Sequence, residues 1–516
     1  MTLFDSSTQV RHLHLKVWLS VFIYAMLAGL AVQLVILPHV FPQLHAGNGL
    51  LAGRDWVGFH EQAVVQSLKI AEFGWSEFRL RPDGENIIAG LCSALYYFIT
   101  PKPWVLLPIN SALFATAALT LFSLVKYLGI SNLHAMFAIA AFVVFPSSIV
   151  QFGQIHKDIF CTSGLLLNLW CWVSLLQRDL QWRRMALIIF ISILATGIVW
   201  LFRPYFMQIL LYWVAAFFCW YLLLAMLMLL KNNSLFFFKM PVSQLVFPIR
   251  SAAVMLLLFF ITHQYYSSYL DLRFHPSETV ESTDNFNDYL NRQGAKIYSF
   301  LSARLAIIPR SSMQSPEAAQ TSETGSENLN DFLANAAKNN RPVAVMKEGA
   351  YVENFVNRIY LRLAVARGGF TNSGKNATTN IDREVVFYSP GDLVRYIPRA
   401  LQIGFFAPFP QNWFGSEGEK KKPNRFEVYI AGMEMLLSYI AFFGWAYWIA
   451  QARKVGVQIW IPTLFALSVI LLMGLTVANV GTLYRMRFPF IMIFITFGVA
   501  GLLQFFNTES RPAKER

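Results

Sequence analysis

Long apolar stretches, separated by shorter polar segments, run through most of the chain. A helix needs about 20 predominantly apolar residues to cross a bilayer, and about ten stretches approach or exceed that length. They are Val17–Pro38, Trp104–Tyr127, His134–Val150, Ile159–Leu176, Met185–Phe202, Tyr205–Leu230, Ile249–Tyr266, Val428–Ala450, Val457–Ala478 and Phe488–Phe506. The pattern predicts an all-α polytopic membrane protein.

Two longer polar regions interrupt this pattern. The first, Leu44–Pro103, contains the apolar stretch Asn86–Thr100, which is too short to span and is expected to be re-entrant or to lie on the membrane surface. The second, Asp271–Arg425, predicts a large loop. Within this loop, Ser311–Asn340 is rich in Ser, Glu, Asn and Ala and is predicted to be flexible. The apolar residues, prolines and aromatics of Leu393–Trp413 favour a segment that lies against the outer membrane face.

These features predict three parts of the chain. Residues 1–270 hold the first seven spans, which we expect to form the transmembrane core. Residues 271–425 form a loop or subdomain outside the cytoplasm, and residues 426–516 hold the last three spans and a tail.

The composition agrees with a membrane protein. Hydrophobic residues make up 56% of the chain and charged residues only 14%, whereas about a quarter of the residues of a soluble domain are charged. The formal net charge is +13, but the basic residues lie mainly between apolar segments, where they set orientation and meet anionic lipid. We therefore predict membrane lipid, and no nucleic acid, as a partner. The four cysteines lie in apolar stretches without metal-ligand spacing.

The distribution of basic residues predicts the orientation. If the N-terminus is cytoplasmic, every predicted inner loop and both ends of the chain carry Lys or Arg, as the positive-inside rule requires. These residues are Arg11, Lys16, Lys126, Arg178, Arg183, Arg184, Lys231, Lys239, Arg250, Arg453, Lys454, Arg511, Lys514 and Arg516. Both termini are then cytoplasmic, and the absence of disulfide cysteines and of an organelle signal favours a bacterial inner membrane.

Five polar elements fall on the predicted outer side of the membrane. They are Asp55 with Arg54, His60 and Glu61; His156, Lys157 and Asp158; Arg203; Arg395 and Arg399; and Arg485 with Arg487. Guanidinium groups hold phosphate through paired hydrogen bonds and stabilise charge on a leaving phosphate. A carboxylate beside an acceptor hydroxyl accepts its proton during transfer. The combination predicts a site for an anionic, lipid-linked substrate at headgroup level.

Simpler roles compete for several of these residues. Arg203 at a helix end could extend its charge to the membrane surface without binding a substrate. Arg485 and Arg487 could hold lipid headgroups structurally. Lys157 and Asp158 could neutralise each other, and a carboxylate also suits the N-terminal end of a helix.

Three further residues allow more than one interpretation. His60 and His156 lack a recognisable metal-ligand spacing, so solvated histidines compete with a metal site. Glu434 falls inside the predicted span Val428–Ala450. Either Glu434 is buried with partners, or it marks a different boundary for that span.

Residues from Arg81 to about Leu176 resemble the core of the GT-C glycosyltransferases, in particular the protein-mannosyltransferase-like and aminoarabinose transferase-like branch. In this resemblance Arg81-Pro82 precedes the short helix Asn86–Thr100, and the next span ends in Lys126-Tyr127-Leu128-Gly129. Pro146 ends the third span, and Asp158 opens the fourth. Asp55 occupies the position of the catalytic acid that follows the first span of the family.

The sequence also departs from the family pattern. Asp55 is followed by Trp56 rather than by a second acid, and Arg81-Pro82-Asp83 replaces a His-Pro-Pro start. The large outer region precedes the last three spans rather than following them. These departures bear on which substrate the resemblance predicts more than on which architecture it predicts.

The resemblance implies a GT-C-like bundle of about ten helices and a membrane glycosyltransferase. It would move a sugar from a polyprenyl phosphate or diphosphate to an extracytoplasmic glycolipid or polysaccharide acceptor. Asp55 would be the base or the organiser of the acceptor, and Asp158 the second acid. Arg203, Arg485, Arg487 and Lys157 would hold the donor phosphate, and Arg54, Glu61, His156 and Arg399 would support the acceptor. A divalent cation, Mg²⁺ or Mn²⁺, is left open as a cofactor.

Two other functions are compatible with a polytopic chain. A polysaccharide polymerase or ligase of the O-antigen type also has many spans, a large outer loop and outer arginines, but it lacks the acid of the first loop. A transporter would have inverted repeats and broken helices near the midplane. The sequence has no internal repeat, and its charged residues cluster outside the apolar segments.

Overall fold

The computed structural model describes ten ranges of the chain. They are 8–52, 55–82, 86–175, 181–231, 242–274, 355–373, 380–387, 389–413, 425–451 and 457–509. Within these ranges all regular elements are helices, and the β structure consists of isolated bridges such as that between His45 and Leu51. The prediction of an all-helical chain is confirmed for them. Residues 311–340, predicted to be flexible, lie outside the described ranges.

The chain divides into two compact units. The first combines Met1–Tyr269, Ile403–Leu471 and Tyr484–Arg516, and the second combines Leu270–Gln402 with Leu472–Leu483. Each unit therefore contains segments that are far apart in the sequence.

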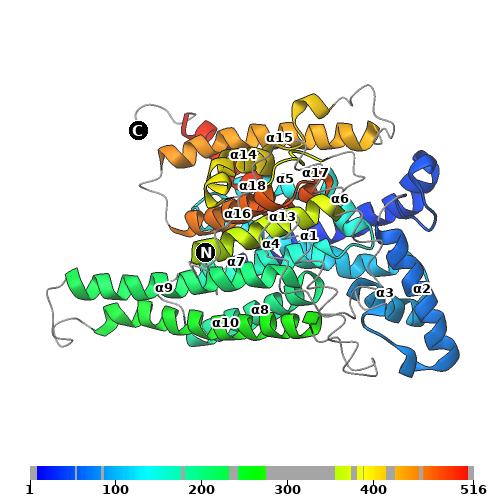
Figure 1. The fold of residues 1–516 in the computed structure, drawn as a ribbon, viewed down its shortest axis with the longest axis horizontal. Helices are drawn as coiled ribbons and strands as arrows, with labels where there is room; N and C mark the ends of the chain where they lie inside the picture. Colours follow the sequence, from blue (N-terminus) through cyan, green and yellow to red (C-terminus); the bar gives the residue numbers. More distant parts are fainter. Residues whose placement is uncertain are drawn as a thin grey trace, which may run out of the picture. The chain divides into compact units, whose positions relative to one another are not determined.

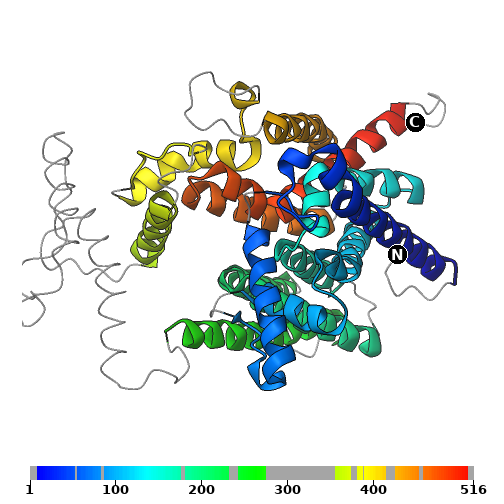
Figure 2. The same cartoon turned by 90° about the vertical axis from the view of Figure 1, so that its right-hand side faces the viewer.

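The first unit is built from long helices (Figures 1 and 2). Those lying in it wholly or for the most part are α1 (Thr8–Ala31), α2 (Asp55–Phe73), α3 (Ile87–Phe98), α4 (Leu107–Lys126), α5 (Asn132–Val143), α6 (Pro146–Gly153), α7 (Asp158–Leu175), α8 (Trp182–Phe202), α9 (Met207–Lys231), α10 (Val242–Phe274), α15 (Arg425–Ala450), α16 (Val457–Thr476) and α18 (Phe488–Glu509). Helix α1 packs against α4, α7 against α8, and α15 against α18. Nearly every residue of α7 is buried, which places this helix at the centre of the bundle.

Eight helices in the described residues are long and apolar enough to cross a membrane, or nine if a bent pair counts as one span. This supports a multi-pass membrane protein, and the total of about ten spans for the whole chain stays a prediction. The predicted seventh span, Ile249–Tyr266, lies inside helix α10 but is not among the eight.

The predicted third span, His134–Val150, is not one straight helix. Helices α5 and α6 meet at an angle of 67°. The break falls at Pro146, the first residue of α6, and Phe145 before it has extended backbone angles. Proline disfavours the helical conformation for the residue that precedes it, so the chain must turn at this point. The predicted third span therefore corresponds to a bent pair of helices, which is either a broken span or a re-entrant loop.

The predicted short apolar element, Asn86–Thr100, corresponds to α3, which has 12 residues. This is too short for a span, as the sequence indicated. Helix α3 packs against α2. In Figure 1 α2 runs at a steep angle to α9 and α10, near one end of these helices.

The second unit contains α13 (Phe355–Ser373) and most of α14 (Pro390–Phe406). Arg367 of α13 is 2% exposed and donates hydrogen bonds to the carbonyl oxygens of Asp382, Val385 and Leu475. The carboxylate of Asp382 accepts a hydrogen bond from Arg399 Nε at 2.8 Å. These two arginines therefore fix the loop around Asp382 to the two helices.

Helices α15 and α18 pack closely through glycine. A Cβ atom added at Gly444 would lie closer than 3.0 Å to the backbone of Gly498, and one added at Gly498 would meet the backbone of Ala441. Small residues allow such close approach between helices in membranes. Backbone atoms cannot move aside as the end of a flexible side chain can, so the contact requires glycine.

We predict that Gly444→Ala destabilises the folded protein by about 1–3 kcal/mol, because the methyl group forces the two helices apart. Thermal unfolding in detergent, followed by circular dichroism, measures the effect. Gly58→Ala in α2 is the matched control, since a Cβ there meets no atom within 4 Å, and it should leave stability unchanged or raise it slightly. Equal melting temperatures for Gly444→Ala and the unmodified protein would contradict the prediction.

Candidate functional site

The two carboxylates singled out in the sequence are each the first residue of a helix. Asp55 begins α2 and Asp158 begins α7. The N-terminal end of a helix carries a partial positive charge, which favours a carboxylate there. Asp158 is buried, with 9% of its side chain exposed, whereas the Asp55 side chain is 56% exposed. The site therefore has one carboxylate facing the protein interior and one facing outward.

Arg203 pairs with the buried carboxylate. It directly follows α8 and precedes Pro204, so the helix ends here and the backbone turns away from helical angles. Arg203 Nε donates to Asp158 Oδ1 at 2.8 Å, and its Nη2 bonds the same oxygen. The Arg203 side chain is only 12% exposed. The attraction of Asp158 raises the pKa of the Arg203 guanidinium against the effect of burial, so the pair is ionic.

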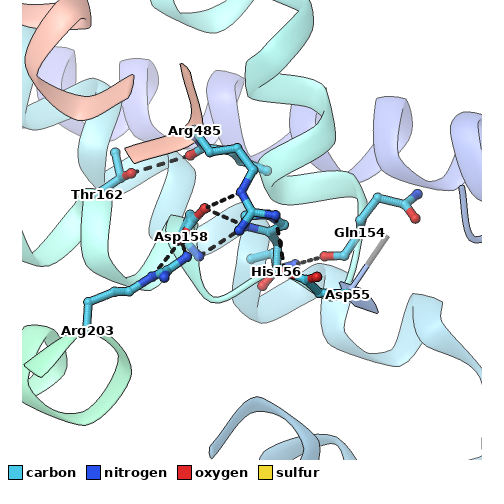
Figure 3. A network of polar contacts seen from close by, with 9 residues as sticks. Asp55, Gln154, His156, Asp158, Thr162, Arg203 and Arg485 are labelled. Atoms are coloured by element: carbon cyan, nitrogen blue, oxygen red, sulfur yellow. Dashed lines mark hydrogen bonds and ion pairs between the residues drawn. The ribbon is translucent and has the colours of Figure 1, made fainter. Parts of the chain in front are cut away.

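Arg485 joins the two carboxylates (Figure 3). It lies in the last turn of α17 (Val480–Met486). Its Nη1 donates to Asp55 Oδ2 at 3.1 Å, and its Nε lies 3.8 Å from Asp158 Oδ2. The structure thus brings together Asp55, Asp158, Arg203 and Arg485, as the prediction of a shared outer site requires.

Two buried atoms at the centre of this cluster have no hydrogen-bond partner among the described residues. They are Asp158 Oδ2 and Arg485 Nε, which face each other at 3.8 Å. A buried polar group without a partner costs about 1–3 kcal/mol. A small polar group that accepts from the guanidinium and donates to the carboxylate, as a hydroxyl does, would satisfy both atoms.

His156 and Lys157 complete the cluster. His156 is buried, and its Nδ1 accepts a hydrogen bond from the backbone N–H of Asp158 at 3.1 Å. Burial lowers the pKa of His156 to about 4 even though Asp158 opposes this shift, so the imidazole is neutral at pH 7. The ammonium of Lys157 lies 5.7 Å from the centre of the Phe59 ring. Burial and the nearby Arg203 lower the pKa of Lys157.

The charges of the cluster do not cancel. Lys157, Arg203 and Arg485 are cations, and Asp55 and Asp158 are anions, which leaves a net charge of +1 from these five side chains. An arrangement of this kind attracts an anionic group.

Gln154, which the sequence did not single out, holds the two carboxylate-bearing segments together. Its Oε1 accepts from the backbone N–H of Leu51 at 3.1 Å, and its Nε2 donates to the Gly49 carbonyl at 3.3 Å. Gln154 therefore ties the loop before Asp55 to the loop before Asp158.

Two amides inside apolar helices support that second loop. Gln33 donates to the Gly153 carbonyl at 2.7 Å, and Asn110 donates to the carbonyls of Phe152 and Gln154, each at 3.0 Å. Both residues are almost fully buried. A polar residue inside a predicted span is a signal available from the sequence, and it would have identified Gln33 and Asn110.

Arg487 does not join the cluster. Its side chain is buried and donates to the carbonyls of Gly404 (2.6 Å) and Ala407, and it contacts the sulfur of Met435 at 3.2 Å. These contacts occupy both terminal nitrogens. The prediction that Arg487 holds the donor phosphate with Arg485 is therefore not supported, and Arg487 does not belong to the candidate site.

Two residues predicted to support the acceptor, Arg399 and Glu61, make none of the contacts of the cluster in the described residues. Arg399 belongs to the second unit, where it pairs with Asp382. Glu61 is exposed on α2 and makes no ion pair within 4.0 Å in the described residues. Arg54 lies outside the described residues.

No metal site is evident in the part of the chain that the structure describes. It contains no group of three or more His, Cys, Asp or Glu side chains placed to hold an ion. His60, one of the two histidines considered as metal ligands, instead contacts the Tyr96 hydroxyl at 2.8 Å and Asn48 at 3.2 Å. The donor set of the cluster does not fit a metal held by protein ligands alone.

Comparison of the chain with models of protein families, with curated proteins and with solved structures finds no match. The resemblance to GT-C glycosyltransferases therefore stays a prediction from the sequence.

The lowered pKa of His156 predicts how stability depends on pH. Between the ordinary pKa of about 6.5 and about 4, the unfolded chain binds a proton that the folded protein does not. The contribution of the neutral His156 to the free energy of unfolding is therefore fully present above pH 6.5 and falls as the pH drops toward 4. Between pH 7 and pH 4.5 the free energy of unfolding of the unmodified protein falls because of His156. We predict that His156→Gln makes this fall smaller by on the order of 2 kcal/mol.

Thermal unfolding at the two pH values tests this. His39→Gln is the matched control, because His39 is exposed at the end of the first span, and it should follow the unmodified protein. Parallel pH curves for His156→Gln and the unmodified protein would show that the neutral imidazole contributes nothing.

Proposed function

We propose that the protein is a membrane glycosyltransferase of the GT-C type. It moves a sugar from a polyprenyl phosphate or diphosphate to a glycolipid or polysaccharide acceptor outside the cytoplasm. The observation that carries the proposal is the position of Arg485 between two carboxylates, with one buried nitrogen that no described residue hydrogen-bonds. The net positive charge of the cluster supports a phosphate-bearing substrate.

The energies of the two ion pairs indicate which arginine binds the donor. Removing one partner of a buried ion pair costs about 3–5 kcal/mol, so Arg203 stays with the buried Asp158. An exposed ion pair contributes only about 0–1 kcal/mol, and Asp55 is half-exposed. Arg485 therefore exchanges Asp55 for a phosphate at little cost. Lys157 adds a second cation beside it.

This exchange frees Asp55 for the acceptor. The acceptor hydroxyl oxygen forms a bond to the anomeric carbon of the sugar, and its proton passes to the Asp55 carboxylate. The bond between the anomeric carbon and the phosphate oxygen breaks, and the leaving phosphate keeps the electron pair. Arg485 and Lys157 stabilise the charge that develops on that oxygen.

Asp158 has a different role in this scheme from the second acid that the family resemblance implies. Its Oδ1 is engaged by Arg203, and its Oδ2 faces Arg485 and His156. Asp158 therefore orients Arg485 rather than moving a proton.

We predict that Asp55→Asn lowers sugar transfer by about 10²- to 10⁴-fold, the usual contribution of a general base. Binding of farnesyl phosphate, a short polyprenyl phosphate, should stay within about twofold, since Arg485 still holds the phosphate. Transfer is measured in lipid nanodiscs as polyprenyl phosphate released from a set of polyprenyl-phosphate sugars. Glu72→Gln, an exposed carboxylate on the same helix, is the matched control and should leave transfer unchanged.

Full transfer by Asp55→Asn would remove the assignment of the base. If Arg485→Ala then abolishes transfer while Asp55→Asn does not, an arginine-dependent ligase or polymerase of the O-antigen type becomes the better description.

A further inference from the structure

Glu434 is a carboxylate inside a membrane span. It lies on α15, within the span Tyr429–Ala450, and is fully buried. An ionisable residue at such a position is costly unless it is paired, and it marks a functional element by default. Of the two alternatives that the sequence left open, the structure supports the first, that Glu434 is buried and partnered.

The partners of Glu434 come from two other segments. Ser147 donates both its backbone N–H and its hydroxyl to the carboxylate, the hydroxyl at 2.6 Å. The Tyr484 hydroxyl donates to the same oxygen as the Ser147 hydroxyl, Oε2. One carboxylate thus joins the N-terminal turn of α6 to α17.

Both of these segments lead to the cluster. Tyr484 directly precedes Arg485 in α17. Ser147 is the second residue of α6, which ends at Gly153, directly before Gln154 and the loop that leads to Asp158. Glu434 is therefore linked to the two segments that set the 3.8 Å separation between Arg485 Nε and Asp158 Oδ2.

Arg487 directly follows α17 and packs beside Tyr484. Its guanidinium lies 5.0 Å from the centre of the Tyr484 ring and contacts Met435, the neighbour of Glu434. Arg487 thus contacts two neighbours of the carboxylate, Tyr484 and Met435, but forms no ion pair with Glu434 within 4.0 Å in the described residues. The guanidinium of Arg487 therefore has structural partners, the carbonyls of Gly404 and Ala407, and needs no substrate to account for it.

We propose that Glu434 is a positioning residue for Arg485 and acts through the Tyr484 hydroxyl. Helix α17 has seven residues, too few to be stable by itself, so its place depends on such contacts. A displacement of about 1 Å is enough to impair a site that must hold its ligand in one geometry. The inference rests on the phosphate-binding role proposed for Arg485.

The test uses farnesyl phosphate as the probe and farnesol as its neutral counterpart, with the full chain in lipid nanodiscs. Glu434→Gln and Tyr484→Phe should each weaken binding of farnesyl phosphate about tenfold, the effect of losing one hydrogen bond to a charged group. The double variant should also lose about tenfold, because Tyr484→Phe removes the hydroxyl through which the change at Glu434 acts. Binding of farnesol should not change.

Ser438→Ala is the matched control. The Ser438 hydroxyl is buried one turn along α15 and bonds the backbone carbonyl of Glu434, not its carboxylate. This variant should bind farnesyl phosphate like the unmodified protein. An equal loss of affinity in Ser438→Ala would mean that general destabilisation of α15 explains the result, and would overturn the inference.

The remaining outcomes separate the two proposals. Unchanged affinity in Tyr484→Phe, which removes a single hydroxyl, would overturn the positioning role alone. A loss of about a hundredfold in the double variant would show independent effects and overturn it as well. If the unmodified protein binds farnesyl phosphate no better than farnesol, the proposed function fails and the positioning role fails with it.

Discussion

The buried carboxylate of Asp158 is the constraint on which the rest of the site depends. It begins α7, the most enclosed of the described spans, and a lone charge at that position would be too costly to keep. Arg203 satisfies one oxygen, and the turn forced by Pro204 places it there. The second oxygen faces Arg485, so the described residues satisfy only half of the carboxylate. The proposal of a substrate site, rather than of a structural ion pair alone, depends on this oxygen.

The surrounding bundle is apolar, but the segments that carry the charged residues are fixed by polar contacts. Gln154 joins the loops that precede the two carboxylates, and Glu434 joins α6 to α17. Apolar packing alone does not define the position of a short loop, because contacts between apolar groups are not directional. Hydrogen bonds from buried amides and carboxylates define it. Arg487 makes buried hydrogen bonds of this kind to backbone carbonyls. It therefore stabilises the fold, although it is only two residues from Arg485 in the sequence.

Much of this arrangement was predictable from the sequence. Apolar stretches indicated the helices, and alternating spans brought Asp55, Asp158, Arg203 and Arg485 toward the same end of the bundle. The bend at Pro146 was predictable from proline chemistry, but the apolar run across it concealed the break. The sequence did not predict that Arg485 joins the cluster whereas Arg487 does not. Residues two positions apart point in different directions, and the partners of both arginines are distant in sequence. The pairing of Glu434 with Ser147 and Tyr484 depends on three helices and has no local signal.

The position of Arg485 is tested most directly by a cryo-electron microscopy map of the protein in lipid nanodiscs with farnesyl phosphate. The proposed site predicts phosphate density against the guanidinium of Arg485, with Asp158 still paired to Arg203 and Asp55 released from the arginine. A map in which Arg485 is remote from both carboxylates, or in which the phosphate binds elsewhere, would contradict it.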